Sequence, residues 1–195
     1  NQSWTEFYPD ASEELPQDMP TPKGKTVRTT CYVDADHAHD LVTRRSVTGI
    51  LLFMNGMPVK WHSKRQKTIE TSSYGSELVA ARMAIDLIIE LRYKLRMLGI
   101  PIEGPTMMLG DNMSVVINTT IPSSQLKKKH NAIAYHRVRE SVAGKIIQFA
   151  HIRSEDNLAD CLTKPLPRIK FVGCVKPVLF RTPTFGNPVE ESIPV

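Results

Sequence analysis

The chain has 195 residues, of which 41% are hydrophobic and 23% are charged, and its formal net charge is +5. This length fits one domain with appendages, and the composition fits a globular protein with a hydrophobic core. No apolar run approaches the about 18–20 residues that a membrane-spanning helix needs. The sequence has neither a phosphate-binding loop nor a dinucleotide-binding fingerprint, which argues against an enzyme with a nucleotide cofactor.

The distribution of charge indicates a polyanionic partner. Residues 1–27 hold five acids, two bases and four prolines, whereas residues 28–168 carry a net charge of +7. Residues 169–195 again hold four prolines and carry a net charge of +1. A basic segment between proline-rich ends is typical of nucleic-acid-binding domains. A basic surface that only promotes solubility is the alternative.

The chain start and the cysteines suggest where the protein works. The opening NQSW has no Met, no basic segment and no apolar segment, so we expect no secretory signal. A missing initiator Met is also what a fragment or a processed polyprotein product would show. The three cysteines are odd in number and widely spaced, which argues against a disulfide scaffold and a zinc site and favours a reducing compartment.

The first half of the chain predicts a connector followed by three strands. Residues 1–25 are rich in turn residues and have no sustained period, which is typical of a connector. Residues 26–34 are β-branched and aromatic, and they predict a strand that a polar loop follows. Residues 49–54 and 57–63 predict a hairpin, because Asn55-Gly56 tolerates the positive φ of its turn.

The second half predicts helices that alternate with strands. Residues 72–98 carry apolar residues at helical spacing and end before Gly99, a helix-stop signal. Strands are expected at 106–109 and 145–151, and helices at 111–119, 131–143 and 155–163. The fold class is therefore α/β, with one mixed five-stranded sheet (three antiparallel strands, then parallel strands) and helices on both faces. We expect a domain over 26–167 and a flexible, proline-rich tail over 168–195.

Four acids occupy positions that a core or an element end would not ordinarily give them. Glu77 shares the apolar stripe of its helix with Ala81 and Ile85, where an unpaired carboxylate is costly unless it binds a metal. Its alternative is a side chain that frays outward near the helix start. Asp34 and Asp111 each end a strand, where a turn aspartate or a helix N-cap explains them equally well. Asp160 would by default be a solvated helix residue.

Several strings of the sequence resemble the ribonuclease H domain of copia-type retrotransposon polyproteins, in order and over about 27–167. The leader WTEFYPDASEELPQDMP also resembles the connector between the reverse transcriptase and ribonuclease H portions of such polyproteins. The matching strings are YVDADHAHDLVTRRSVTGILLF, WHSKRQKTIETSSYGSELVAARMA, LGDNMSVVINTT, KKKHNAIAYHRVRE and EDNLADCLTKPLP.

The resemblance implies a site of four acids. Asp34, Glu77, Asp111 and Asp160 match the catalytic, metal-binding acids of the family. Asp36 is the rival of Asp34, and Asp156 is the rival of Asp160. His151 resembles a histidine that is thought to aid product departure in retroviral relatives, although many copia-type elements lack it. Its alternative is a residue that simply ends a strand.

The chemistry of such a site calls for carboxylates. Hydrolysis of a phosphodiester with two Mg²⁺ ions about 4 Å apart activates water and stabilises charge on the attacking and leaving oxygens. Mg²⁺ prefers hard oxygen ligands, so acids suit it better than His or Cys. We therefore expect two Mg²⁺ ions as cofactors, with Mn²⁺ as a substitute.

The implied substrate is the RNA strand of an RNA–DNA hybrid, recognised by shape and by its 2′-hydroxyl groups. The implied partner is the reverse transcriptase portion of the same polyprotein, in a cytoplasmic retrotransposon particle or in the nucleus, with no membrane involved. Trp61 could stack on a sugar, but a core position is the commoner one for a hairpin Trp. Candidate phosphate-binding residues are Lys64, Arg65, Lys67, Lys127, Lys128, Lys129 and Arg137, with Lys60 and Arg139 as further candidates; a solvated surface role is the alternative for each.

Two departures from the family pattern keep a second function open. His39 stands where relatives commonly have Gly, and Gly110 replaces a bulkier residue before the third acid. The tail after Arg168 also departs from the pattern. An active ribonuclease H is the favoured function, and a catalytically silent remnant that at most binds nucleic acid is the alternative. An integrase-type transferase ranks a distant third, because its acids follow a different order.

Overall fold

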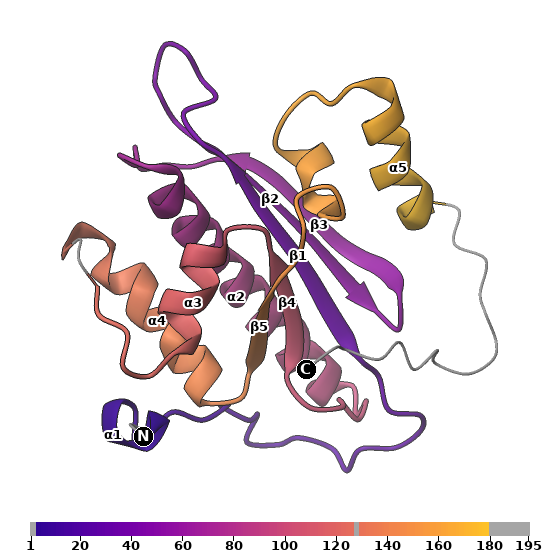
Figure 1. The fold of residues 1–195 in the computed structure, drawn as a ribbon. Coiled ribbons are helices and arrows are strands. Elements are labelled where there is room, and N and C mark those ends of the chain that lie inside the picture. The colour runs from indigo at the N-terminus through magenta and orange to yellow at the C-terminus, as the bar shows by residue number, and fades with distance from the viewer. Residues whose placement is uncertain (1–2, 127–128, 180–195) are drawn as a thin grey trace, which may run out of the picture.

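The computed structural model describes residues 3–126 and 129–179. One five-stranded sheet has the order β3-β2-β1-β4-β5 (Figure 1). β1 pairs antiparallel with β2 and β2 with β3, whereas β1–β4 and β4–β5 are parallel. This confirms the predicted sheet. Its strands are β1 (Thr29–Asp36), β2 (Val47–Met54), β3 (Met57–Arg65), β4 (Thr106–Gly110) and β5 (Ile147–His151).

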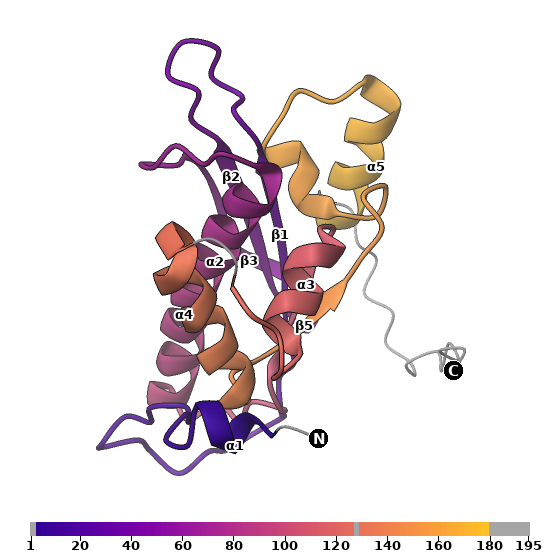
Figure 2. The same cartoon turned by 60° about the vertical axis from the view of Figure 1, so that its left-hand side comes forward.

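Helices lie on both faces of the sheet, as predicted (Figures 1 and 2). One core cluster joins Ile85 and Ile88 of α2, Val115 of α3 and Val138 of α4 to buried residues of the sheet such as Leu52. The other face of β1 and β2 contacts the short 3₁₀ helix η2, on which α5 packs. Among the described residues, no helix is both long and apolar enough to cross a membrane. The helices are α1 (Trp4–Phe7), α2 (Ser73–Met97), α3 (Met113–Thr120), η1 (Lys129–Asn131), α4 (Ala132–Ala143), η2 (Leu158–Leu162) and α5 (Arg168–Leu179).

The long helix α2 has the ends that its sequence predicts. The Ser72 side chain caps its start by accepting a hydrogen bond from the backbone N–H of Gly75. Gly99 follows its end with a φ of +68°, a conformation that glycine adopts at little cost. Residues of its apolar stripe, such as Ala84 and Ile88, are fully buried. The stripe therefore fixes which side of α2 faces the sheet, and with it the orientation of the first turns.

Three expectations differ from the structure. The last predicted helix is the 3₁₀ helix Leu158–Leu162, because the Asn157 side chain caps it and i→i+3 hydrogen bonds such as Thr163 N–H to the Asp160 carbonyl close it. Trp61 is not in the core but 70% exposed, since it lies on the edge strand β3. Residues 168–179 of the predicted flexible tail form α5, which buries Cys174; residues 180–195 lie outside the described part of the chain.

The N-terminal connector packs against the end of the sheet where β4 begins. Both oxygens of the Glu13 carboxylate accept hydrogen bonds from Arg92 and from Arg96. Arg92 is buried at the end of α2 and also donates to the Gly104 carbonyl and the Thr106 hydroxyl. The connector is thus tied to the helix that carries Glu77.

A second contact ties the connector to α4. The Arg139 guanidinium lies over the rings of Trp4 and Tyr135, 4.9 and 5.0 Å from their centroids. It also donates hydrogen bonds to backbone carbonyls of Asn118, Ile121 and Pro122. Arg139 is buried, and these contacts occupy its guanidinium group. It therefore stabilises the packing of the connector and is not available to bind phosphate.

Candidate metal centre

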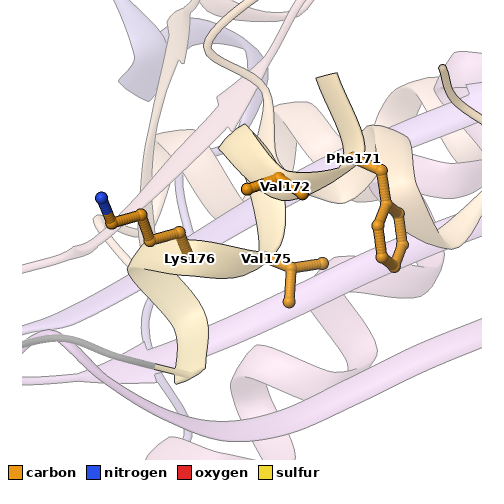
Figure 3. A pocket seen from close by; sticks show the side chains of 4 residues that line it. All are labelled: Phe171, Val172, Val175 and Lys176. Carbon is orange, nitrogen blue, oxygen red and sulfur yellow. The ribbon is translucent and has the colours of Figure 1, made fainter. Parts of the chain in front are cut away.

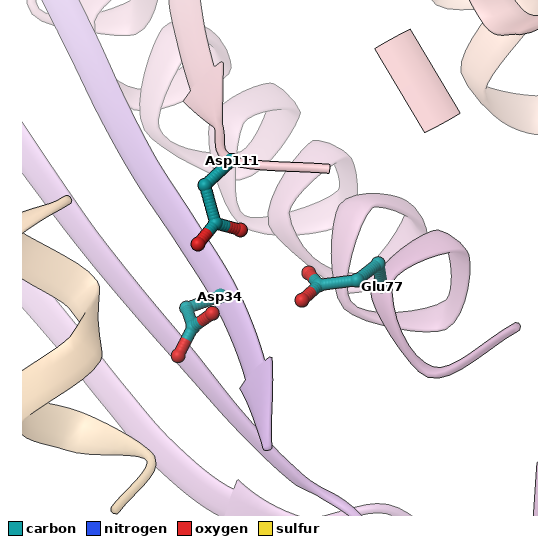
Figure 4. A group of neighbouring side chains, drawn as sticks. All are labelled: Asp34, Glu77 and Asp111. Atoms are coloured by element: carbon teal, nitrogen blue, oxygen red, sulfur yellow. The ribbon is translucent and has the colours of Figure 1, made fainter. Parts of the chain in front are cut away.

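Four strand ends meet at one end of the sheet. β1, β3, β4 and β5 all run in the same direction, because β3 is antiparallel to β2 and β2 to β1. Asp34 lies near the end of β1, and Asp111 directly follows β4. Glu77 lies in the first turns of α2, which begins at this end. The three carboxylates point toward one another (Figure 4).

Asp34, Glu77 and Asp111 form a compact acidic triad. One ligand oxygen from each lies within 4.8 Å of those of the other two, a separation that one metal ion could bridge. Asp34 is only 1% exposed, and Glu77 and Asp111 are partly buried. The apolar stripe of α2 thus turns Glu77 inward instead of letting it fray into solvent.

The electrostatics of the triad favour a bound cation. Burial, together with the nearby carboxylates of Asp34 and Asp111, raises the pKa of Glu77 to about 9. Burial likewise raises the pKa of Asp34 to about 6, against hydrogen bonding by Thr163 and the charge of Lys164. A divalent cation would remove this repulsion. Three hard oxygen donors in close reach fit Mg²⁺ or Mn²⁺ better than a softer metal.

Gly110 contributes to the packing behind the triad. A Cβ atom at this position would lie 3.2 Å from Cε2 and 3.3 Å from Cζ of Phe149, and 3.4 Å from Cγ1 of Val33. The two aromatic contacts are tighter than most Cβ contacts, so a side chain here would push on β5. Phe149 therefore fills the space that a larger residue at position 110 would need.

Asp160 contacts Asp34 of the triad and also has two lysines as partners. It is fully buried, and its two oxygens lie 2.9 Å from Nζ of Lys164 and 2.5 Å from Nζ of Lys170. Burial alone would raise the pKa of Asp160, but hydrogen bonds from Lys170 and Lys164 outweigh burial and lower it. Thr163, also in this segment, donates a hydrogen bond to the Asp34 carboxylate. The compact group of three excludes Asp160.

The rival acids point to other partners. Asp36 pairs with His39 at 2.6 Å, and Asp156 pairs with Arg153 at 2.8 Å. His39 stands where relatives commonly have Gly, but its φ is not positive. The residues of this loop with a positive φ are Ala38 and Arg44. His151 ends β5, is exposed, and places Nε2 3.2 Å from the backbone carbonyl of Asp111. It therefore borders the triad.

The predicted phosphate-binding residues have different surroundings. Lys64 lies near the end of β3, at the same end of the sheet as the triad, and Lys67 follows exposed. Arg65 pairs with Asp40 at 2.6 Å, and Arg137 lies 3.6 Å from both Asp86 and Glu140. Lys129 begins η1 and is exposed. Lys127 and Lys128 lie outside the described residues.

Two lysines of the site escaped the sequence prediction. Lys164 stands four residues after Asp160, a spacing that could have suggested an ion pair. Lys170 gave no such signal, because its segment was expected to be flexible.

A hollow on α5 is unsuited to a metal. Its volume is about 390 Å³, and its lining residues, Phe171, Val172, Val175 and Lys176, offer no carboxylate or imidazole (Figure 3).

Comparison with curated proteins finds relatives among transposon polyproteins. The chain is 33% identical over 152 residues, 76% of its length, to the retrovirus-related Pol polyprotein from transposon RE2 of Arabidopsis thaliana. It is 33% identical over 143 residues, 73% of its length, to the one from transposon TNT 1-94 of Nicotiana tabacum. The chain spans about a tenth of the length of these relatives, 10% and 11%.

A shorter match reaches a different kind of protein. Over 71 residues, the sequence is 38% identical to the secreted RxLR effector protein 161 of Plasmopara viticola. The match covers 36% of this chain and 50% of that protein. No family model matches the sequence.

Solved structures show the same fold. The chain is similar to LC11-RNase H1, solved in complex with an RNA/DNA hybrid, with a TM-score of 0.55, 16% identity, and coverage of 70% of this chain and 94% of that one. RNase H1 from Halobacterium salinarum gives a TM-score of 0.52 at 15% identity, with the same coverage of 70% and 94%. The sequence relatives show that the chain belongs to the retrovirus-related Pol polyproteins of transposons, and the solved structures show that its fold is that of ribonuclease H.

Proposed function

We propose that this domain is a divalent-metal-dependent ribonuclease that hydrolyses the RNA strand of an RNA–DNA hybrid during reverse transcription of a retrotransposon. The observation that carries the proposal is the triad of Asp34, Glu77 and Asp111, whose ligand oxygens lie within 4.8 Å of one another. Buried carboxylates that repel one another without a cation have a clear use in a metal site and none in a core.

The chain's own residues give the site its chemistry. Asp34, Glu77 and Asp111 would hold Mg²⁺, which when bound lowers the pKa of water and stabilises charge on the reacting phosphate. Thr163 fixes the Asp34 carboxylate through its hydrogen bond, and the backbone N–H of Ala35 bonds the Glu77 carboxylate. These contacts set the orientation of the ligands before any substrate arrives. His151, whose Nε2 lies 3.2 Å from the Asp111 carbonyl, would assist departure of the product.

The substrate proposal rests on the fold and the surrounding charge. LC11-RNase H1, a protein of the same fold, was solved with an RNA/DNA hybrid. In this chain the exposed Lys64 and Lys67 follow the hairpin at the triad end of the sheet, and Lys129 begins η1. Such cations suit contacts with phosphates on either side of a scissile bond. The reverse transcriptase portion of a Pol polyprotein is the proposed partner, in the particle or the nucleus.

The test is cleavage of a hybrid whose RNA and DNA strands carry different end labels. We expect Mg²⁺ or Mn²⁺ to support cleavage of the RNA strand only, and a chelator or the Glu77→Gln variant to abolish it. Glu103→Gln is the matched control, because Glu103 is an exposed acid that pairs with Arg28 at the opposite end of the sheet. Absence of RNA cleavage by the folded wild type, alone and with a polymerase portion supplied, would contradict the proposal.

One observation favours the silent alternative. Asp160, an acid of the family pattern, is held by two lysines. A domain whose fourth acid never leaves those lysines could bind a hybrid without cutting it. Binding of the hybrid by wild type and Glu77→Gln alike, with no cleavage by either, is the result that this alternative predicts.

A further inference from the structure

Asp160 already has two cations of the chain's own. Its Oδ1 lies 2.9 Å from Nζ of Lys164 and its Oδ2 lies 2.5 Å from Nζ of Lys170. The carboxylate is fully buried, so neither oxygen is open to solvent. A divalent ion could reach this carboxylate only by displacing at least one ammonium group.

Lys164 also approaches the triad. Its Nζ lies 3.8 Å from Oδ2 of Asp34 and 2.9 Å from Oδ1 of Asp160, so the ammonium group contacts both carboxylates. Lys164 follows Thr163, whose hydroxyl donates to the same Asp34 carboxylate. A metal ion shared by Asp34 and Asp160 would therefore compete with the ammonium group of Lys164 for both carboxylates.

Lys170 is held in place by α5. Cys174, one turn further along this helix, is 3% exposed and places its sulfur 4.0 Å from the carbonyl of Asn157. Asn157 in turn donates a hydrogen bond to the Val33 carbonyl on β1, next to Asp34. The helix is thus anchored to the strand that carries the triad, and its lysine is a fixed neighbour of Asp160.

The formal charges distinguish one bound ion from two. Ionised, the triad and Asp160 carry four negative charges, and Lys164 and Lys170 supply two positive ones. One divalent ion at the triad makes the group neutral. A second ion would leave two excess positive charges in a partly buried site before any phosphate arrived, which is unfavourable.

We propose that Lys164 and Lys170 are the resident cations of Asp160, and that the free domain therefore binds one divalent ion, at the triad, instead of two ions shared by four acids. The inference rests on the proposed function only in taking the triad as a metal site. It assigns the two lysines a positioning role. A second ion can enter only when Lys164 or Lys170 leaves Asp160.

Titration of the metal-free chain with MnCl₂ tests the proposal, with free Mn²⁺ followed by electron paramagnetic resonance and heat followed by calorimetry. We expect one ion per chain for the wild type and none for Asp111→Asn. Asp160→Asn should still bind one ion per chain, because the carboxylate of Asp160 is not a ligand of that ion. Two ions of comparable affinity in the wild type, or no bound ion in Asp160→Asn, would overturn the proposal.

The lysine variants give the complementary result. Lys164→Met/Lys170→Met frees Asp160 and should bind a second ion, whereas Lys176→Met, on an exposed turn of α5, should bind one as the wild type does. If the double variant does not fold, as judged by circular dichroism, the isosteric Asp160→Asn still decides the question. Hybrid cleavage, measured separately, tests the function: one ion without cleavage contradicts the function alone, and two ions with cleavage contradict this inference alone.

Discussion

The two ends of the sheet treat buried carboxylates in opposite ways. Where β4 begins, burial raises the pKa of Glu13, but hydrogen bonds from Arg92 and Arg96 outweigh burial and lower it to about 2. Where β4 ends, burial and the neighbouring acids Asp34 and Asp111 raise the pKa of Glu77 to about 9. Each carboxylate is largely removed from water, but Glu13 accepts hydrogen bonds from two arginines, whereas the main neighbours of Glu77 are other acids.

The difference separates a structural cluster from a functional one. Glu13 closes an ion pair that ties the connector to α2, and its charge is satisfied by the fold itself. The triad is left with a surplus of negative charge that a divalent cation can satisfy. Asp160 lies at the triad end of the sheet, but it pairs with two lysines, Lys164 and Lys170.

The largest effect should follow from removing a triad oxygen. We expect Asp111→Asn to lower the rate of RNA cleavage at least about 100-fold, the scale on which loss of one electrostatic stabiliser acts in enzymes. The circular dichroism spectrum should stay that of the wild type, because the side chain is only partly buried. Cleavage by Asp111→Asn within tenfold of the wild type would show that the triad is not the catalytic site.

At the opposite end, loss of a carboxylate should affect stability and leave the chemistry intact. Glu13→Ala leaves Arg92, whose side chain is 3% exposed, without its carboxylate partner. Breaking a buried pair in this way costs about 3 kcal/mol in the free energy of unfolding. Denaturant unfolding measures the loss, with Glu14→Ala, an exposed neighbour, as the control. Equal stability of the two variants would show that the connector is not part of the folded domain.

The metal-free protein should lose stability as the pH rises. Glu77 ionises near its ordinary value of 4.5 in the unfolded chain but only near 9 in the folded chain, so the folded state binds more protons between these values. The free energy of unfolding then falls with rising pH over this window. Thermal unfolding in a chelator measures the slope, which Glu77→Gln should reduce.

Mg²⁺ supplies the second arm of the same experiment. A cation that binds only the folded state stabilises it by about 2.7 kcal/mol at a hundredfold excess over its Kd. Because Mg²⁺ favours the ionised carboxylates, the stabilisation should grow as the pH rises. A melting temperature that does not respond to millimolar Mg²⁺ at neutral pH would contradict a metal site at the triad.

The smallest expected effect concerns phosphate contacts. Lys64→Ala should lower the affinity of Glu77→Gln protein for the hybrid, and it should reduce the slope of log affinity against log salt by about one. Lys145→Ala, at the opposite end of the sheet just before β5, should leave the slope unchanged. Fluorescence anisotropy at several salt concentrations measures both. Equal slopes for the two variants would remove Lys64 from the hybrid surface.

The sequence predicted the elements whose signals are local. The stripe of Ala84 and Ile88 placed α2, Asn55-Gly56 placed the hairpin, and strand ends placed Asp34 and Asp111. The inward position of Glu77 followed from helical spacing alone. These features depend on periodicity and turn chemistry, which a single sequence contains.

The features that escaped prediction depend on long-range contacts. The proline-rich composition of residues 168–195 gave no indication of α5. This helix is held by the burial of Cys174 against the 3₁₀ helix, which is a tertiary contact. Lys170 therefore could not be assigned to Asp160. Trp61 was expected in the core because a strand pattern does not reveal that its strand lies at the edge of the sheet. Contacts of this kind have no counterpart in local propensity.

Anomalous diffraction from crystals soaked in Mn²⁺ would locate the bound ion. We expect one peak per chain, bounded by the carboxylates of Asp34, Glu77 and Asp111, and none in crystals of Asp111→Asn. The ammonium group of Lys164 should remain on Asp160. The absence of a peak at the triad in well-ordered, Mn²⁺-soaked crystals would show that Asp34, Glu77 and Asp111 do not form a metal site.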